Sequence, residues 1–193
     1  MQKPHLQIII GSTRPGRAGE AVARWFRDIA VKHDAFTVEI LDLAAIDLPL
    51  LDEPNHPRLG RYVHEHTKRW SATISEGDAF VFVVPEYNRG YNAATKNALD
   101  YLCNEWRRKP VGFVGYGAAA GGARSIQGLI PVVAVLGMIP AARSVNIPLI
   151  NRLITAEGEF TPNPRLDDSA GEMLDELSSW AADLATVRRG TDD

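Results

Sequence analysis

Residues 79–88 read AFVFVVPEYN, six consecutive apolar residues followed by proline and then by Glu-Tyr-Asn. An apolar run of this length, ended by a turn signal, predicts a strand that is buried on both faces of a sheet. A helical pattern begins within a few residues, at Ala93. The order of strand, turn and helix therefore puts Pro85 to Asn88 at the carboxyl end of a strand, where open α/β sheets bind their ligands.

The same alternation of apolar strands and amphipathic helices extends along the chain. It predicts strands at Leu6–Ile10, Phe36–Leu43, Asp78–Val84, Pro110–Gly115 and about Ala142–Ile147. It predicts helices at Ala18–Lys32, about Leu59–Ser75, Ala93–Glu105, Ser125–Leu136 and Asp168–Arg188, a long loop over Ala44–Pro57, and a frayed end at 190–193. Such alternation is typical of an α/β fold with a parallel sheet covered by helices on both faces.

Length and composition fit one domain spanning residues 1–193. The formal net charge of −3 gives no general attraction to nucleic acid or to an anionic membrane. The first apolar stretch, Leu6–Ile10, is too short to span a bilayer or to act as a signal peptide, so we expect a cytoplasmic protein. A single cysteine, Cys103, excludes an intramolecular disulfide and a CxxC redox pair.

The loop after the first predicted strand has the composition of a phosphate site. Residues 11–17 read GSTRPGR, with two hydroxyl side chains and two arginines directly before a helix. Backbone amides and guanidinium groups at a helix start bind phosphate oxygens well. The dinucleotide pattern GxGxxG is absent, and Arg17-Ala18 follows where a P-loop needs Lys-Ser/Thr. The loop therefore suits a phosphomonoester, and the alternative is a surface turn with incidental arginines.

Residues 115–124, which read GYGAAAGGAR, form a third loop after the fourth predicted strand. Small residues let the backbone approach a planar ligand closely, and successive amides can stabilise negative charge on it. A glycine-rich loop alone more often means a tight turn. Here, three loops follow strands one, three and four, so they lie at one edge of the sheet.

With these three loops in this order, the first three quarters of the chain resemble the NADPH-dependent FMN reductases. The resemblance implies a flavodoxin-like fold, an α/β three-layer sandwich with a five-stranded parallel sheet in the order 2-1-3-4-5. It also implies an oxidoreductase that binds FMN and passes hydride from NADPH or NADH to a small acceptor such as a quinone or a free flavin. Family members form homodimers or homotetramers with the flavin near an interface, so a homo-oligomer is implied as well.

The resemblance assigns FMN-binding residues to each of the three loops. These are Ser12, Arg14, Arg17, Ala18 and Gly19 for the phosphate, Pro85, Glu86, Tyr87 and Asn88 for the ring, and Gly115, Tyr116, Gly117, Gly121 and Gly122 in the third loop. Two positions depart from the family pattern: Asn92 stands where a proline is usual, and Gly115 replaces a serine. No residue is assigned a catalytic role, because hydride transfer is the chemistry of the cofactor.

An alternative from another class is an FMN-binding electron carrier or redox sensor without catalysis. The arginines of the first loop and the nearly balanced charge favour the enzyme, since flavodoxins have acidic docking surfaces. A reductase that binds FMN only transiently, as a substrate, is a third reading. The sequence decides neither between this reading and a tightly bound cofactor nor between NADPH and NADH.

Two further signals are given structural readings. His64-Glu65-His66 resembles a metal-binding pair, but residues two apart on a helix project to different faces, so no metal site is expected. Asp42 lies at the end of the second predicted strand, where a dinucleotide-binding fold has a ribose-binding acid. Because GxGxxG is missing, we interpret Asp42 as a cap at the strand end.

Overall fold

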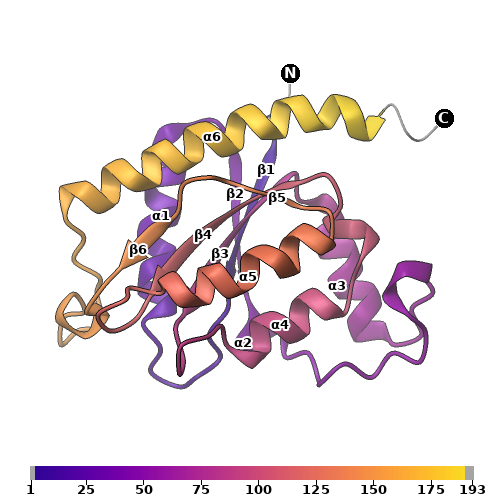
Figure 1. Ribbon diagram of the computed structural model, residues 1–193, viewed down its shortest axis with the longest axis horizontal. Helices are drawn as coiled ribbons and strands as arrows, with labels where there is room; N and C mark the ends of the chain where they lie inside the picture. The colour runs from indigo at the N-terminus through magenta and orange to yellow at the C-terminus, as the bar shows by residue number, and fades with distance from the viewer. Residues whose placement is uncertain (1–2, 190–193) are drawn as a thin grey trace.

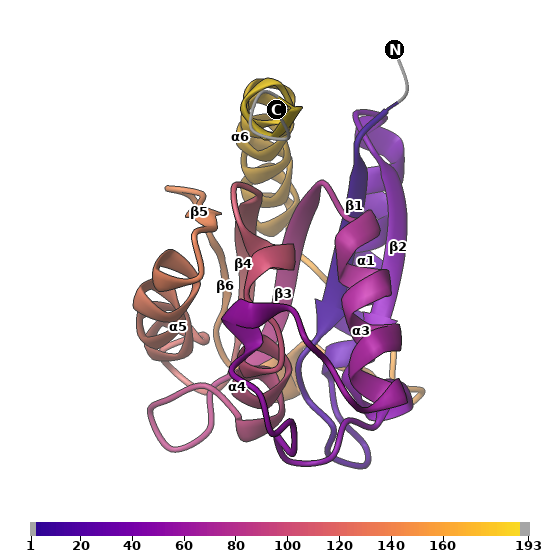
Figure 2. The same cartoon turned by 90° about the vertical axis from the view of Figure 1, so that its right-hand side faces the viewer.

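A computed structural model describes residues 3–189, in which a parallel sheet is covered by helices on both sides (Figures 1 and 2). The strands are β1 His5–Ile10, β2 Thr37–Asp42, β3 Ala79–Pro85, β4 Pro110–Tyr116, β5 Ile139–Pro140 and β6 Val145–Ile147. Their order is β2-β1-β3-β4-β5, with β6 also paired to β4, and every pair is parallel. The predicted class and strand order are confirmed.

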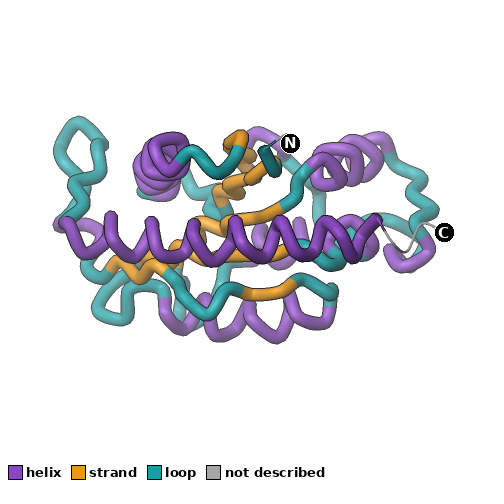
Figure 3. Tube along the Cα trace, turned by 90° about the horizontal axis from the view of Figure 1, so that it is seen from above, coloured by secondary structure: helices purple, strands orange, loops and turns teal. Residues whose placement is uncertain are grey.

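The helices are α1 Gly19–His33, α2 Leu43–Ile46, α3 Glu65–Glu76, α4 Ala93–Asp100, α5 Ala123–Val135 and α6 Pro164–Arg189, with 3₁₀ turns at Pro57–Leu59, Asn104–Trp106 and Ile150–Arg152. Helices α1 and α6 pack on one face of the sheet, and α3, α4 and α5 pack on the other. Helix α6 is the long helix that passes over the strands in Figure 3. No helix among residues 3–189 is long and apolar enough to cross a membrane.

The central strands are apolar throughout because helices cover both faces of the sheet. Alternate residues of one strand enter different cores: Ile8 and Ile10 pack with α1 and α6, whereas Ile9 packs with the opposite helices. All seven residues of β3 are buried, as are all seven of β4. Burial on both faces is what a continuous apolar run predicts, and it fixes the edge at which the loops emerge.

Several element boundaries differ from the predictions. The fifth strand, expected at about Ala142–Ile147, is split into β5 and β6, and Pro140 in β5 has no N–H for a continued ladder. Helix α3 begins at Glu65 rather than near Leu59, after Gly60 turns the chain with a φ of 61°. The helix expected to reach Glu105 ends at Asp100. The predicted frayed end, 190–193, lies outside the described residues.

Candidate functional site

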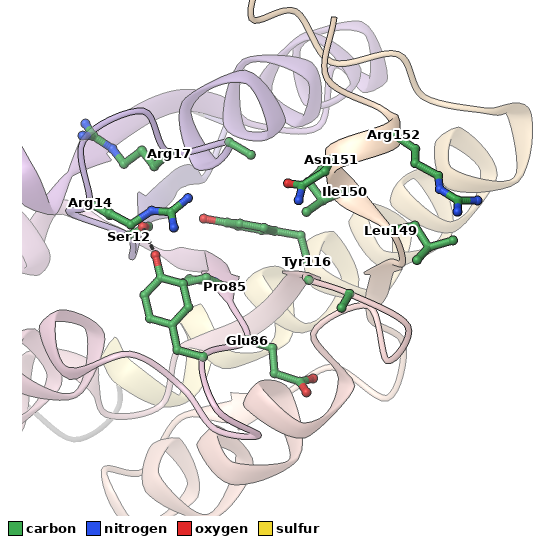
Figure 4. A pocket seen from close by; sticks show the side chains of 14 residues that line it. Ser12, Arg14, Arg17, Pro85, Glu86, Tyr116, Leu149, Ile150, Asn151 and Arg152 are labelled. Carbon is green, nitrogen blue, oxygen red and sulfur yellow. Dashed lines mark hydrogen bonds between the residues drawn. The ribbon is translucent and has the colours of Figure 1, made fainter.

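The loops after β1, β3 and β4 meet the segment after β6 at the carboxyl edge of the sheet, around a pocket of about 380 Å³ (Figure 4). The three loops predicted from the sequence are therefore brought together. Predicted site residues that line the pocket are Ser12, Arg14, Arg17, Ala18, Pro85, Glu86, Tyr87, Tyr116 and Gly117. The other five, Gly19, Asn88, Gly115, Gly121 and Gly122, are not among its lining residues.

Ser12 and Arg14 present the polar groups of the first loop to the pocket. Ser12 is fully buried, and its hydroxyl lies 2.7 Å from the hydroxyl of Tyr87, which joins the first loop to the Pro-Glu-Tyr-Asn turn. The Arg14 guanidinium points into the pocket in Figure 4. Among residues 3–189 it has no ion pair and no side-chain hydrogen bond. Its charge is thus available to an anionic ligand.

Arg17, three residues later, is held by carboxylates of the protein itself. Its Nη2 atom donates to Asp42 at 2.6 Å and lies 2.7 Å from a carboxylate oxygen of Glu20. In Figure 4 its guanidinium turns away from the Arg14 side chain and from Tyr116. Asp42 also accepts a hydrogen bond from the amide of Ala44 at 3.0 Å, as a cap of α2. The predicted capping role of Asp42 is therefore present, together with an ion pair that was not predicted.

The Pro-Glu-Tyr-Asn turn is fixed by backbone hydrogen bonds. The amide of Glu86 donates to the Tyr116 carbonyl at 2.9 Å, and Tyr87 and Gly90 exchange two bonds of 3.0 Å. Asn88 and Arg89 take the left-handed conformation at the tip, with φ of 50° and 70°. Asn88 consequently lies beyond the pocket wall, although it shares the turn with three residues that line the pocket.

Asn92 is the residue directly before α4, and its side chain makes no capping hydrogen bond to the helix amides. Its amide group donates instead to the carbonyl of Gly11 at 2.6 Å, and its carbonyl oxygen accepts from Thr95 at 2.8 Å. The residue that replaces the usual proline thereby ties the first loop to α4. Both bonds are buried, where a hydrogen bond is costly to lose, so the substitution keeps this corner rigid.

The carboxylate of Glu86 faces the third loop and not the pocket centre. It accepts hydrogen bonds from the Arg124 amide at 3.2 Å and from Arg124 Nε at 2.5 Å, and only 7% of the Glu86 side chain is exposed. Figure 4 shows the Glu86 side chain directed away from Arg14 and Ser12. Its charge is neutralised by the first turn of α5, so Glu86 contributes backbone and position to the pocket wall.

The glycines of the third loop outside the pocket are required by close packing. Gly122 has a φ of 84°, and a Cβ there would lie 2.4 Å from the carbonyl carbon of Gly115. A Cβ on Gly121 would lie 2.9 Å from the nitrogen of Pro148. Gly19 at the start of α1 stands against Tyr116, whose hydroxyl would be 2.8 Å from an added Cβ. These glycines do not line the pocket but allow the close packing that supports its walls.

Tyr116 lies across the pocket, with its hydroxyl directed toward Arg14 (Figure 4). The residue is 5% exposed, and its hydroxyl finds no hydrogen-bond partner among residues 3–189. Burial raises the pKa of Tyr116 above the usual range for tyrosine, so the hydroxyl is a neutral donor at neutral pH. A buried hydroxyl without a partner is costly, and a ligand oxygen would satisfy it.

The fourth wall, Leu149 to Arg152, was not predicted. The amide of Leu149 donates to Ala118 at 2.9 Å and that of Ile150 to Gly117 at 3.0 Å, which ties this segment to the third loop. Leu149 adopts the left-handed conformation with a φ of 53°. The available signal was topological: residues after a last parallel strand emerge at the same edge as the other loops.

Contrary to the expectation from their spacing, His64 and His66 do not project to different faces. His64 is the residue before α3 and lies outside its helical turn, so its ring stacks on that of His66 at 5.2 Å. His66 pairs with Asp52 at 2.9 Å. These rings hold the loop before α3, away from the pocket described above.

Comparison with known proteins gives consistent results. The sequence model of the NADPH-dependent FMN reductase family matches residues 4–151. The NAD(P)H-dependent FMN reductase ntnL of a Nectria species is 38% identical over 149 residues, 74% of each chain. An NAD(P)H-dependent FMN reductase of Schizosaccharomyces pombe is 42% identical over 121 residues, 62% of this chain and 60% of that one.

Solved structures show the same fold at low identity. The flavoenzyme NAD(P)H:(acceptor) oxidoreductase FerB of Paracoccus denitrificans superposes with a TM-score of 0.75 at 21% identity, over 93% of this chain and 98% of that chain. A flavodoxin of Streptococcus pneumoniae gives a TM-score of 0.56 at 11% identity, over 90% of this chain and 97% of that chain. The fold is flavodoxin-like.

Proposed function

The chain belongs to the NADPH-dependent FMN reductase family, and from this premise we propose that its pocket binds FMN and that the enzyme is an NAD(P)H oxidoreductase with a small acceptor, such as a quinone or a free flavin. The observation that carries the proposal is the set of unsatisfied donors at one end of the pocket. Arg14 and the Tyr116 hydroxyl both lack partners among the described residues. Ser12 lines the same pocket, and its hydroxyl is hydrogen-bonded to that of Tyr87.

The donor set fits the single phosphate of FMN. A phosphomonoester offers three oxygens, and these donors are one charged fork and two neutral hydroxyls. Gly117 and Ala118 line the pocket together with Glu86, and their small side chains leave room for a planar ligand. Ile150 and Leu149 add apolar surface from the segment after β6. A pocket that combines apolar surface with polar groups placed at one end is typical of cofactor sites.

Bound FMN would supply the hydride acceptor and donor, which no side chain of the pocket provides. The chain's own residues would orient the cofactor and neutralise its negative charge. Arg14 balances a negative charge at the phosphate end, and Glu86 holds Arg124 at the start of α5 so that the third loop keeps its shape. Tyr116 is protonated at neutral pH, and burial raises its pKa further, so its hydroxyl would donate a hydrogen bond to the ligand.

The decisive experiment is the absorption spectrum of the freshly purified protein, with the released flavin identified, followed by steady-state NADPH oxidation with a small quinone. We expect turnover with NADPH that depends on FMN. A yellow protein that does not turn over with NADPH and quinone would instead be a carrier. A colourless protein that turns over only with added FMN would use the flavin as a substrate.

Selectivity for FMN over FAD follows from the same donor set. The first loop offers one phosphate position, and Arg17, which would be the next cation, is paired with Asp42 and Glu20. Titration of apoprotein with each flavin tests this proposal. Comparable affinities for the two flavins would contradict it.

We further propose a homodimer or homotetramer. Large apolar side chains remain exposed in the stretch between α2 and α3, including Leu50 at 81%, Leu59 at 59% and Val63 at 52% exposure. Exposed apolar groups gathered in one region are typical of protein interfaces. Light scattering coupled to size exclusion checks this proposal, and a mass of one chain at micromolar concentration would overturn it.

A further inference from the structure

Arg152 lies at the rim of the pocket across from Arg14, and its guanidinium is directed outward, away from Arg14 and Tyr116 (Figure 4). It ends the 3₁₀ turn Ile150–Arg152 and is exposed. Within residues 3–189 its guanidinium takes part in no ion pair and no hydrogen bond. A long cation held at the mouth of a pocket without a partner is available for a ligand's anionic group.

The segment that carries Arg152 is held firmly although it lies at the surface. The amides of Leu149 and Ile150 bond to the third loop at 2.9 and 3.0 Å, and the amide of Arg152 donates to the Leu149 carbonyl at 2.8 Å. Leu149 holds a φ of 53° while 43% exposed. A non-glycine residue in this conformation is uncommon, and such strain is concentrated at sites that bind ligands.

The charges around the pocket leave Arg152 uncompensated. Glu86 is the one acidic residue among those lining it, and Arg124 neutralises that carboxylate at 2.5 Å. Arg17 is balanced by Asp42 and Glu20. Two cations therefore remain, Arg14 beside Ser12 and Arg152 at the opposite rim. FMN has one phosphate, which the Ser12 and Arg14 end already satisfies, so Arg152 is left for a second anionic ligand.

We propose that Arg152 binds a phosphate group of the pyridine dinucleotide and so helps to select the electron donor, an inference that rests on the proposed function. A nicotinamide placed in the pocket leaves the remainder of its dinucleotide outside, across the rim. That remainder carries the pyrophosphate, and in NADPH also the 2′-phosphate. Guanidinium forks bind both kinds of phosphate, and the two are separable by comparing NADPH with NADH.

The test compares Arg152→Gln and Arg152→Lys with a matched control, Arg165→Gln. Arg165 is an exposed arginine on α6 that does not line the pocket. For each FMN-loaded protein, NADP⁺ and NAD⁺ dissociation constants are measured by titration, and KM and kcat with NADPH and with NADH. FMN affinity is measured separately on the apoproteins.

For Arg152→Gln we expect a rise of about tenfold or more in the NADP⁺ dissociation constant and in KM for NADPH, as for loss of one charge-assisted hydrogen bond. FMN affinity and kcat at saturating NADPH should change less than about twofold, since the group acts on nucleotide binding. Arg152→Lys should retain part of the affinity, and Arg165→Gln all of it. A loss confined to NADP⁺ and NADPH assigns the 2′-phosphate, and an equal loss for NAD⁺ and NADH assigns the pyrophosphate.

Unchanged nucleotide binding in Arg152→Gln overturns the inference, as does an equal loss in the Arg165→Gln control. A parallel loss of FMN affinity also overturns it, because Arg152 would then belong to the flavin site. These outcomes differ from a failure of the proposed function, in which wild-type protein oxidises neither NADPH nor NADH.

Discussion

The two ends of the parallel sheet use their basic residues differently. At the amino end, the Lys109 ammonium donates to the carbonyls of Ile74 and Ser75 at 2.9 and 3.2 Å. At the same end, Arg188 bonds to Asp78 at 2.7 Å. At the carboxyl end, Arg14 faces a pocket with no partner among residues 3–189. The basic side chains at the amino end bond to groups of the protein, whereas Arg14 at the carboxyl end remains available to a ligand.

Arg17 shows that position alone does not decide the role. It lies at the carboxyl end, three residues after Arg14, yet Asp42 and Glu20 hold it as tightly as the amino-end cations are held. What separates the two arginines is whether the fold supplies a carboxylate within reach. Four predictions test this distinction. Each asks whether a polar side chain stabilises the protein or binds a ligand.

The largest effect concerns Lys109, whose pKa is lowered to about 8 from 10.5, first by burial and then by the charge of Arg188. Between these values the unfolded chain binds more protons than the folded protein, so stability rises with pH. The gain over the whole window is on the order of 3 kcal/mol. Urea unfolding at intervals from pH 7 to 10 should show the rise, and Lys109→Met should remove it.

At the upper end of this pH range, ionisation of tyrosine has the opposite effect on stability. The pKa of Tyr101 is raised to about 12, first by burial and then by its hydrogen bond to Asp52, so the folded protein keeps a proton that the unfolded chain loses near pH 10. The difference between wild type and Lys109→Met at each pH cancels this contribution. A wild-type slope no greater than that of the variant would show that Lys109 is not desolvated.

The second effect is at Arg14. Charge-assisted bonds to a phosphate contribute on the order of 1.5–3 kcal/mol, so Arg14→Ala should weaken FMN binding by about 10–100-fold. Riboflavin, which has no phosphate, should bind nearly as before. Fluorescence titration of apoprotein with both ligands measures this difference. Equal losses for both would mean that Arg14 supports the fold, and the contrast between the two sheet ends would fail.

Arg17→Ala should have a smaller effect on FMN, no more than about fivefold, because an ion pair with Asp42 and Glu20 already compensates the charge. The same titration with FMN and riboflavin measures it. Asp42→Asn provides the reciprocal test. If the ion pair with Asp42 keeps the Arg17 guanidinium away from the phosphate, Asp42→Asn should bind FMN at least as well as wild type. A loss in Arg17→Ala as large as in Arg14→Ala would place both arginines on the phosphate.

The sequence predicted the sheet well, because each central strand of a parallel sheet is buried on both faces and reads as an unbroken apolar run. β3 and β4 are examples, with every residue buried. It predicted element ends less well. The split between β5 and β6 depends on how a two-residue and a three-residue strand dock on β4, and such short segments have too few residues for a pattern.

The candidate site was predicted as three loops and is built from four. Loop composition indicated which backbone segments converge, but not which side chains face the pocket. Glu86 is neutralised by a residue 38 positions away, and Arg17 by Asp42, 25 positions away. Such pairings depend on tertiary structure, which periodicity and spacing do not report. The position of Arg152 at the pocket rim likewise depends on tertiary structure, because its segment follows the short strand β6.

The smallest expected effect, on the rate of flavin reduction, is that of Tyr87→Phe. It distinguishes a hydroxyl that only lines the pocket from one that donates a proton. Its hydroxyl lies 2.7 Å from that of Ser12, and the residue is 39% exposed, so water can replace the lost hydrogen bond in Tyr87→Phe. A partly exposed neutral hydrogen bond contributes little, and we expect less than about a threefold loss in the rate of flavin reduction by NADPH at saturating FMN. Proton donation by Tyr87 would make the same change cost about 10²-fold or more. Stopped-flow reduction of wild type and variant, with FMN occupancy checked by absorbance, separates these cases. A loss of two orders of magnitude with FMN still bound would mean that a hydroxyl at the carboxyl edge of the sheet does take part in the chemistry, and that the edge supplies more than position and charge.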